Sequence, residues 1–413
     1  ASQDPDMPGC VTYYTSLLPG SFKQYSTPFD SFWCCVGTGM ENHSKYAESI
    51  YFKDNQELLV NLYIPSRLHW KEKGLKLTLD TYFPESDTVT VRMDEIGSYT
   101  GMLLFRYPDW VSGDAVVRIN GKPAQTEAHK GSYIRLLDSV KSGDVITLVF
   151  TRNLYIDYAK DEPHFGSVMY GPILLAGGLG TDDMPEDRVI DNRACRESLP
   201  AKNIPMLVGP LADLDSWIQC SSQHPLRFTV KNGGGQQGVG LIPYFQMHHQ
   251  RHTVYWKLYS PDEFVYRTRS LTDEVKIGDE KDEGKHALQG ENDSIYWHDY
   301  FWAKNTRFRM AKDGWFSYTL HINKTEQKPY HLICRFWGDE PDTCQFDILI
   351  DGNYLRTVSL NRKLYLTYVD DVYSIPADWT RGKDKVNVTF RAAQGKNAGG
   401  LYELKITSDT NYR

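Results

Sequence analysis

The sequence has little net charge, no long hydrophobic run and few cysteines for its length. It carries 46 Lys and Arg against 53 Asp and Glu over 413 residues, a formal net charge of −7. Because the basic residues are scattered, no positive surface is predicted that could hold a phosphate backbone, which argues against nucleic acid as a partner. No run of about 18 apolar residues occurs, so no transmembrane helix is predicted.

Neither a signal peptide nor a disulfide framework is predicted from the sequence. The first ten residues, ASQDPDMPGC, are polar and have neither a basic start nor an apolar core. The seven cysteines are odd in number and irregularly spaced, which disfavours a dense set of disulfides. Cys334 and Cys344 flank a predicted turn, and they either bridge neighbouring strands or remain reduced core thiols.

What the sequence has in abundance is aromatic residues, at 13%, and segments with alternating apolar and polar positions. Alternation is typical of strands with one buried face, and turn-forming residues separate these segments at roughly 8–12-residue intervals. Asn120-Gly121 and Asp351-Gly352 are strong hairpin patterns. The predicted fold class is therefore mainly β. It consists of tandem antiparallel β-sandwich domains that resemble jelly rolls.

Composition divides the chain into four predicted domains. Residues 1–50 include a short predicted helix over 39–50. Residues 51–176 are predicted to form a β-sandwich, 177–265 a small accessory β module, and 266–413 a C-terminal β-sandwich. The charged run from Asp279 to Glu283, near the start of the last domain, is predicted to be a solvated loop.

The most unusual local motif is Phe32-Trp33-Cys34-Cys35-Val36-Gly37-Thr38-Gly39. Adjacent cysteines rarely bond to each other, because neighbouring Cβ atoms point apart. Two thiolates on one loop can instead bind Zn²⁺, which would lower a thiol pKa and create a nucleophile. The residues alone leave open a second interpretation, a pair of buried structural thiols, since a zinc site needs more ligands than this pair supplies.

The stretch FWCCVGTGMENHSKYAESIY, from Phe32 to Tyr51, resembles the Cys-Cys segment of the β-L-arabinofuranosidases of glycoside hydrolase families 127 and 146. The similarity continues through 60–77, 143–150 and 170–177, and 242–258 resembles an accessory module of many members. The resemblance implies an (α/α)6 catalytic barrel followed by β-sandwiches. It also implies retaining hydrolysis by a zinc-bound cysteine, with a glutamate as general acid and then base.

Carried over by motif, the resemblance implies that Cys34 is the nucleophile and a zinc ligand, and that Cys35 is a second zinc ligand. Tyr13, in TYYTSLL, matches a substrate-contacting tyrosine. The family takes its other zinc ligands from an upstream Glu-x-Cys element, and its acid/base glutamate is also upstream. Only 33 residues precede Cys34 here and none forms Glu-x-Cys, so the helical barrel is reduced to a short N-terminal remnant.

These considerations predict the C-terminal portion of a retaining glycoside hydrolase, inactive without the missing barrel. Two explanations for the missing barrel remain open. The barrel is a separate or cleaved polypeptide that acts as a partner, or the reading frame is truncated and the chain has no activity of its own. The resemblance implies a plant-type glycan or arabinofuranoside as substrate and a periplasmic or secreted location.

The alternative is a non-catalytic carbohydrate-binding or scaffold protein. The end of the chain, 398–406, faintly resembles a jelly-roll carbohydrate-binding module, a class that often holds a structural calcium; its ligands here are unplaced. His248-His249-Gln250-Arg251-His252 suggests a metal site, but its histidines do not share one face of a strand, which favours a structural or interdomain role. Four tryptophans could form a sugar platform or pack in the core: Trp297, Trp302, Trp315 and Trp337.

Overall fold

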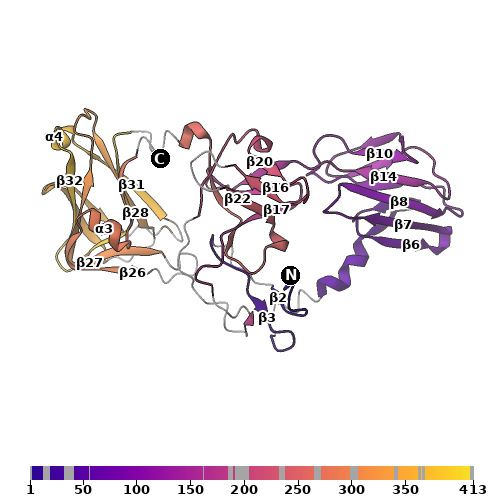
Figure 1. The fold of residues 1–413 in the computed structure, drawn as a ribbon, viewed down its shortest axis with the longest axis horizontal. Coiled ribbons are helices and arrows are strands. Elements are labelled where there is room, and N and C mark those ends of the chain that lie inside the picture. The colour runs from indigo at the N-terminus through magenta and orange to yellow at the C-terminus, as the bar shows by residue number, and fades with distance from the viewer. Residues whose placement is uncertain are drawn as a thin grey trace. The chain divides into compact units, whose positions relative to one another are not determined.

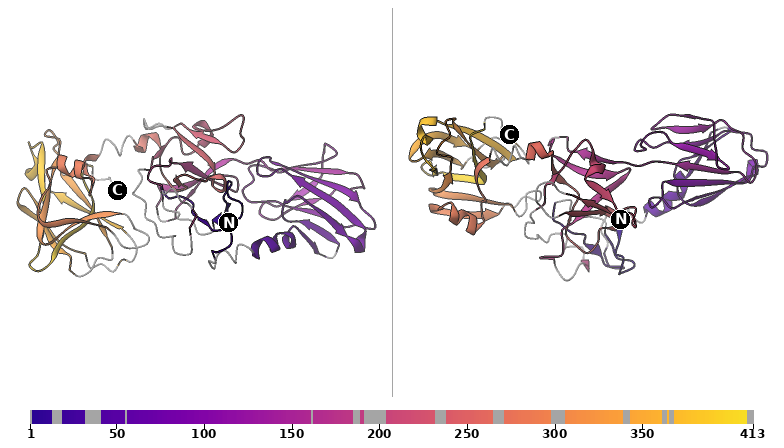
Figure 2. Two further views of the ribbon diagram at one scale, coloured as in Figure 1. Left: turned by 60° about the horizontal axis from the view of Figure 1, so that its bottom comes forward. Right: turned by 45° about the horizontal axis from the view of Figure 1, so that its top comes forward.

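In its regular elements, the computed structural model consists mostly of β-strands, which confirms the predicted fold class (Figure 1 and Figure 2). It describes residues 2–12, 19–31, 41–54, 56–160, 162–184, 189–190, 204–231, 238–264, 271–297, 306–338, 343–360, 364 and 368–409. The chain divides into two compact units near residue 260, and each is described below by itself.

The first β-sandwich has two sheets around one apolar core. One sheet has the order β11(Lys122–Pro123), β10(Val116–Ile119), β14(Val145–Val149), β8(Thr88–Glu95), β7(Leu75–Thr81) and β6(Ser66–Trp70). The other has the order β12(Thr126–Ala128), β13(Tyr133–Leu136), β9(Leu103–Arg106), β5(Glu57–Val60) and β4(Tyr51–Asp54). Alternate residues such as Leu75, Leu77 and Leu79 are buried, as a period of two requires.

Local turn chemistry accounts for several strand ends in this sandwich. Asn120 and Gly121 adopt φ values of 51° and 79° and close the predicted hairpin between β10 and β11. The strand β5 ends at Val60. The reason is that the next two amides, of Asn61 and Leu62, both donate to the carbonyl of Ile50 and turn the chain away from the sheet.

The accessory module is organised around one larger sheet (Figure 1). Its order is β19(Leu207–Val208), β24(Trp256–Tyr259), β16(Phe165–Tyr170), β17(Ile173–Gly178), β22(Val239–Pro243), β21(Phe228–Val230) and β20(Ile218–Cys220); β15(Leu154–Tyr158) adds to β16 and β23(His252–Thr253) to β17. Trp256 is fully buried and packs so closely on Gly177 that a Cβ there would lie 2.3 Å from its ring. Glycine is therefore required at this position.

The structure divides this region differently from the predicted boundary at residue 176, which falls inside β17. Strands β15, β16 and β17 belong to the accessory sheet, and the preceding sandwich ends with β14 at Val149. Alternation of apolar and polar residues runs through both domains without a break in composition. Only strand pairing, which is a tertiary property, separates them.

The second unit is one extensively paired β module. Its order is β30(Asn353–Ser359), β29(Gln345–Ile350), β32(Lys385–Ala392), β27(Arg307–His321), β33(Asn397–Thr407), β28(Tyr330–Trp337) and β31(Tyr368–Ile375); β25(Leu271–Val275) adds to β33 and β26(Gln289–Trp297) to β27. The turn Asp351-Gly352 joins β29 to β30, as predicted, with φ values of 48° and 81°. A short helix, α4(Ala377–Thr380), lies between β31 and β32.

The charged run from Asp279 to Glu283 is a helix start and not the predicted solvated loop. Asp279 is the N-cap of α3(Glu280–Lys285), and its Oδ1 accepts hydrogen bonds from the amides of Lys281 and Asp282. Glu283 is buried, 2% exposed, because Arg309 and Tyr318 bind its carboxylate. Cys334 and Cys344 are buried free thiols, which resolves the predicted alternatives in favour of reduced cysteines.

Candidate active site

The three residues expected to contact zinc or substrate, Tyr13, Cys34 and Cys35, lie outside the residues that the structure describes. Both flanks of the Cys-Cys motif are described. The upstream flank, 19–31, lies against the accessory module, and the downstream flank, 41–49, runs into β4 of the first sandwich. The structure therefore shows how the chain on either side of the candidate nucleophile is anchored.

The upstream flank is held by the segment 248–252, which we call the histidine clasp. The amide of His252 donates to the carbonyl of Ser21 at 2.8 Å, and the amide of Gly20 donates to the carbonyl of His252 at 2.9 Å. Nε of Arg251, a fully buried side chain, donates to the carbonyl of Gly20 at 2.6 Å. The segment predicted to have an interdomain role thus extends a β-bridge to the candidate catalytic segment.

Side-chain contacts also join the upstream flank to the accessory module. Tyr25 Oη lies 2.6 Å from Nδ1 of His248, and Lys23 Nζ donates to the carbonyl of Tyr244 at 2.7 Å. Burial lowers the pKa of Lys23 to about 8. Further along, β3(Tyr25–Ser26) pairs in parallel with β18(Val189–Ile190). The backbone preceding the Cys-Cys loop is therefore fixed by strand pairing as well as by side chains.

Residues 2–12 are attached to the clasp by an acidic pair. Nε2 of His249 lies 2.9 Å from Oδ2 of Asp4, and its Nδ1 lies 3.2 Å from Oδ2 of Asp6. Burial raises the pKa of Asp4, but hydrogen bonds from the Asp6 amide and from His249 outweigh it and leave that pKa below its usual value. One imidazole thus uses both of its nitrogens on two carboxylates, which ties residues 2–12 to the clasp.

The clasp should weaken in mild acid. Burial lowers the pKa of His252 to about 4 from 6.5, so between these pH values the unfolded chain binds a proton that the folded chain does not. Stability should fall as the pH drops from 6.5 to about 4, by roughly 3 kcal/mol at the end of that window. The measurement is amide hydrogen exchange of residues 19–31 together with urea unfolding across this range.

His252→Gln should reduce that pH dependence, since the ring with the largest shift is removed. Burial also lowers the pKa of His248, so a smaller acid response should remain. His129→Gln, at an exposed histidine in the first sandwich, is the matched control and should leave it unchanged. Asp4 should not add to the loss of stability in this pH range. Its pKa is lowered in the folded chain, so its stabilising effect is lost only as the pH falls below the usual aspartate value of 3.8. An equal acid response in His252→Gln and the parent chain would contradict the assignment.

The downstream flank is anchored by backbone hydrogen bonds to the first sandwich. Residues 41–45 are helical and continue into η1(Tyr46–Ser49), as the sequence predicted. Asn61 Nδ2 donates to the carbonyl of Ser49 at 3.0 Å, and Ile50 is buried where β4 begins. Glu41, His43 and Lys45 are exposed on this helix.

The two cysteines predicted to bind zinc suit that metal chemically but supply only two ligands. Two thiolates suit Zn²⁺, which takes four ligands in its structural and catalytic sites. Cys10 is the further thiol nearest in sequence, and it is 3% exposed; burial and then the charge of Asp4 raise its pKa, so it stays protonated. Among the described residues, neither group with metal-binding geometry contains a cysteine. The remaining ligands would have to come from another segment.

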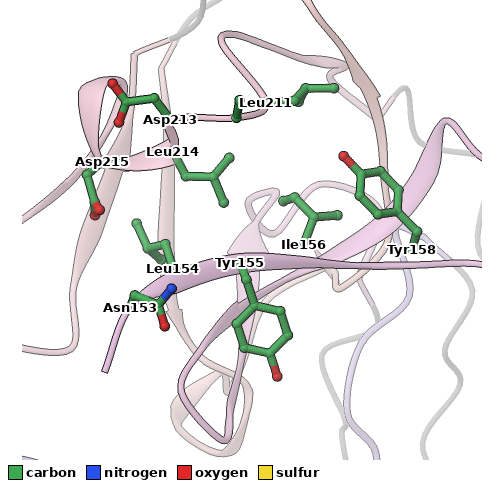
Figure 3. Close-up of a pocket in the computed structure, with 10 residues that line it drawn as sticks. Asn153, Leu154, Tyr155, Ile156, Tyr158, Leu211, Asp213, Leu214 and Asp215 are labelled. Atoms are coloured by element: carbon green, nitrogen blue, oxygen red, sulfur yellow. The ribbon is translucent and has the colours of Figure 1, made fainter. Parts of the chain in front are cut away.

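A hollow of about 300 Å³ lies in the accessory module between β15 and η3(Leu214–Ser216). Figure 3 shows aliphatic side chains of Ile156, Leu211 and Leu214 at its centre, with the carboxylates of Asp213 and Asp215 directed away from them. A specific ligand site needs convergent polar groups. This hollow has none among its labelled side chains, so we assign it no catalytic role.

Family comparisons match four successive stretches of the chain. Residues 1–48 match the β-L-arabinofuranosidase GH127 catalytic domain and 57–152 the GH127 middle domain. Residues 155–258 match a domain of unknown function, and 268–407 a family of unknown function (DUF6805). The first match includes Tyr13, Cys34 and Cys35. The junction between the second and third matches coincides with the change of sheet between β14 and β15.

Solved structures show partial similarity. A glycoside hydrolase is 20% identical, with a TM-score of 0.45 over 61% of this chain and 45% of the other. A GH127 β-L-arabinofuranosidase from Geobacillus stearothermophilus T6 is 17% identical, with a TM-score of 0.37 over 55% and 37%. A further GH127 β-arabinofuranosidase is 17% identical, with a TM-score of 0.40 over 61% and 44%. The chain thus spans less than half of each, and no curated protein sequence matches it significantly.

Proposed function

The chain belongs to glycoside hydrolase family GH127, and we propose that it is the C-terminal portion of a retaining β-L-arabinofuranosidase whose nucleophile is Cys34. The observation that supports this most is the catalytic-domain match over residues 1–48, since it includes the Cys-Cys motif. Both flanks of that motif are bound to β modules, upstream by the histidine clasp and downstream by β4. The modules would hold the nucleophile loop in place for the barrel.

The proposed reaction has two steps. The Cys34 thiolate bonds to the anomeric carbon as the glycosidic C–O bond breaks, and a glutamate of the barrel protonates the departing oxygen. A water molecule, deprotonated by the same glutamate, then displaces the thiolate and restores the original anomeric configuration. Cys34 and Cys35 would hold zinc, which lowers the pKa of a coordinated thiol. Tyr13 would contact the sugar.

The test is to join the chain to the upstream barrel segment that the proposal requires. We expect the chain alone to be inactive and the joined protein to hydrolyse an aryl β-L-arabinofuranoside, with NMR showing the β-anomer as first product. A folded joined protein that fails to hydrolyse this substrate, or that first releases the α-anomer, would overturn the proposal. Plant-derived glycans are the proposed natural substrates.

We further propose a periplasmic or secreted location, because polymeric plant glycans do not enter cells intact. Within the described residues, no helix has the length and apolarity needed to cross a membrane. Fractionation of the native host would test this location, with the protein expected outside the cytoplasm.

A second candidate function, glycan binding by the C-terminal module, is favoured by one surface feature. A hollow of about 340 Å³ lies over β26, β27 and β32. Its lining combines an aromatic ring with polar side chains: Gln289, Trp315, Ser317, Asn387, Thr389 and Arg391. Trp315 is half-buried at this hollow, while its neighbour Phe316 points into the core. An indole face flanked by hydrogen-bonding groups suits a sugar ring.

Of the two alternatives for the tryptophans, core packing holds for Trp337, and the described tryptophans differ in their surroundings. Trp337 is 5% exposed and packs on Tyr368, while Trp297, 50% exposed, lies under the guanidinium of Arg307. Trp302 lies outside the described residues. We expect Trp315→Ala to lower affinity for an immobilised plant polysaccharide about tenfold, with Trp297→Ala as the matched control. Equal retention of both variants would exclude this site. A structural calcium in this module stays a prediction.

A further inference from the structure

Three potential metal ligands meet in the C-terminal module, far along the chain from the Cys-Cys motif. They are Asp273 on β25, His286 directly after α3, and His321 at the end of β27, and each offers one ligand atom within 4.8 Å of the others. Nε2 of His286 lies 3.3 Å from Oδ1 of Asp273, and Nδ1 of His321 lies 3.1 Å from Oδ2 of Asp273. Three separate elements thus present ligand atoms to one point.

The hydrogen bonds of His286 leave its Nε2 without a proton in the neutral ring. Nδ1 lies 2.8 Å from the carbonyl of Asp282, so Nδ1 carries the hydrogen that this bond requires. In the neutral ring, Nε2 then presents a lone pair to the Asp273 carboxylate. Two acceptors at this distance repel each other unless a cation or a proton lies between them. His286 is 5% exposed, and solvent has little access to relieve that repulsion.

Neighbouring groups hold the side chains of His286 and Asp273 in position by hydrogen bonds, as the groups around metal ligands commonly do. The carbonyl of Asp282 fixes the ring of His286, and the Asp282 carboxylate is itself fixed by the amide of Lys276 at 2.8 Å. The amide of His321 donates to Oδ2 of Asp273 at 2.6 Å, and the amide of Glu274 donates to Oδ1 at 3.0 Å. A carboxylate with these two bonds keeps lone pairs free for a metal.

From this geometry we propose that Asp273, His286 and His321 form a site for a divalent transition metal such as zinc. Ligands of a tetrahedral ion with bonds of about 2.1 Å are separated by about 3.4 Å. The distances of 3.3 and 3.1 Å end on different oxygens of Asp273, but one ligand atom from each residue lies within 4.8 Å of the others, so small side-chain movements would bring one oxygen and two nitrogens to a single ion. Two imidazoles and one carboxylate suit zinc, nickel or copper, whereas calcium requires six to eight oxygens. Bound metal would cross-link β25, the end of α3 and β27.

The full chain with Cys34→Ser and Cys35→Ser is the protein to test, so that thiolates do not contribute. Titration with ZnCl₂ followed by calorimetry should show a site that His321→Ala and His286→Ala each weaken at least tenfold. His331→Gln is the matched control, since this histidine of the same module contacts Ser374 outside the cluster, and it should not alter binding. His321 is exposed, so its replacement should not disturb folding.

Cobalt provides a readout of ligand type. Co²⁺ bound here should show visible absorption typical of a nitrogen- and oxygen-ligated ion, and His321→Ala should abolish it. The absence of zinc binding in the parent protein, or binding that His321→Ala leaves unchanged, would overturn the site. In that case the contact between His286 and Asp273 would be a hydrogen bond without metal.

Discussion

Replacing Cys34 with serine in the chain joined to its upstream barrel should lower kcat/KM for an aryl β-L-arabinofuranoside at least about 1,000-fold. A serine hydroxyl is almost wholly protonated at neutral pH, whereas a cysteine beside a cation ionises readily. Serine is also a poor zinc ligand, so the variant would lose the nucleophile and a metal contact together. The measurement is steady-state hydrolysis, with zinc content determined on the same sample.

Cys220→Ser is the matched control, because Cys220 is an exposed free thiol in the accessory module, distant in sequence from the motif. It should retain full activity. Cys35→Ser should lose zinc along with most of the activity, as expected for a ligand that does not attack the sugar. A Cys34→Ser variant with parental kcat/KM would exclude Cys34 as the nucleophile.

Replacing Glu283 with alanine should lower the free energy of unfolding of the C-terminal module by about 3–5 kcal/mol. The carboxylate of Glu283 accepts a hydrogen bond from Tyr318 Oη at 2.6 Å and from Arg309 Nη2 at 2.8 Å. All three residues are less than 9% exposed, and Arg309 also pairs with Asp293. Alanine would leave Arg309 short of negative charge in a site where water replaces it poorly.

Urea unfolding monitored by tryptophan fluorescence measures this effect. Glu280→Ala is the matched control, since Glu280 is exposed in the same first turn of α3 and differs from Glu283 chiefly in burial. It should cost well under 1 kcal/mol. If the two variants unfold at the same urea concentration, the buried network contributes nothing specific to stability.

Much of the fold could be predicted because its determinants are local. Side-chain alternation located β7, β8, β13 and β14, and the Asn-Gly and Asp-Gly pairs located two hairpins, since φ > 0 strongly favours such residues. The reduced state of Cys334 and Cys344 and the boundary near residue 150 were not determined locally. Each depends on which strands become neighbours, and alternation does not specify neighbours.

The helix α3 shows how burial can reverse a local expectation. Asp279 to Glu283 carries four acidic residues and one lysine, a composition typical of solvated loops. Arg309, from a distant strand, binds Glu283 and makes its burial favourable. Likewise, no residue near Asp4 in the sequence predicts that its partner is His249, which lies 245 positions further along the chain.

The sequence by itself determined the β class of the fold, its main hairpins and the family to which the Cys-Cys motif belongs, because each depends on residues adjacent along the chain. Only the tertiary structure decided that the histidine clasp holds the candidate catalytic segment, and that Asp273, His286 and His321 converge. Such contacts join residues far apart in sequence, and their energies depend on burial and distance, which a linear pattern does not contain.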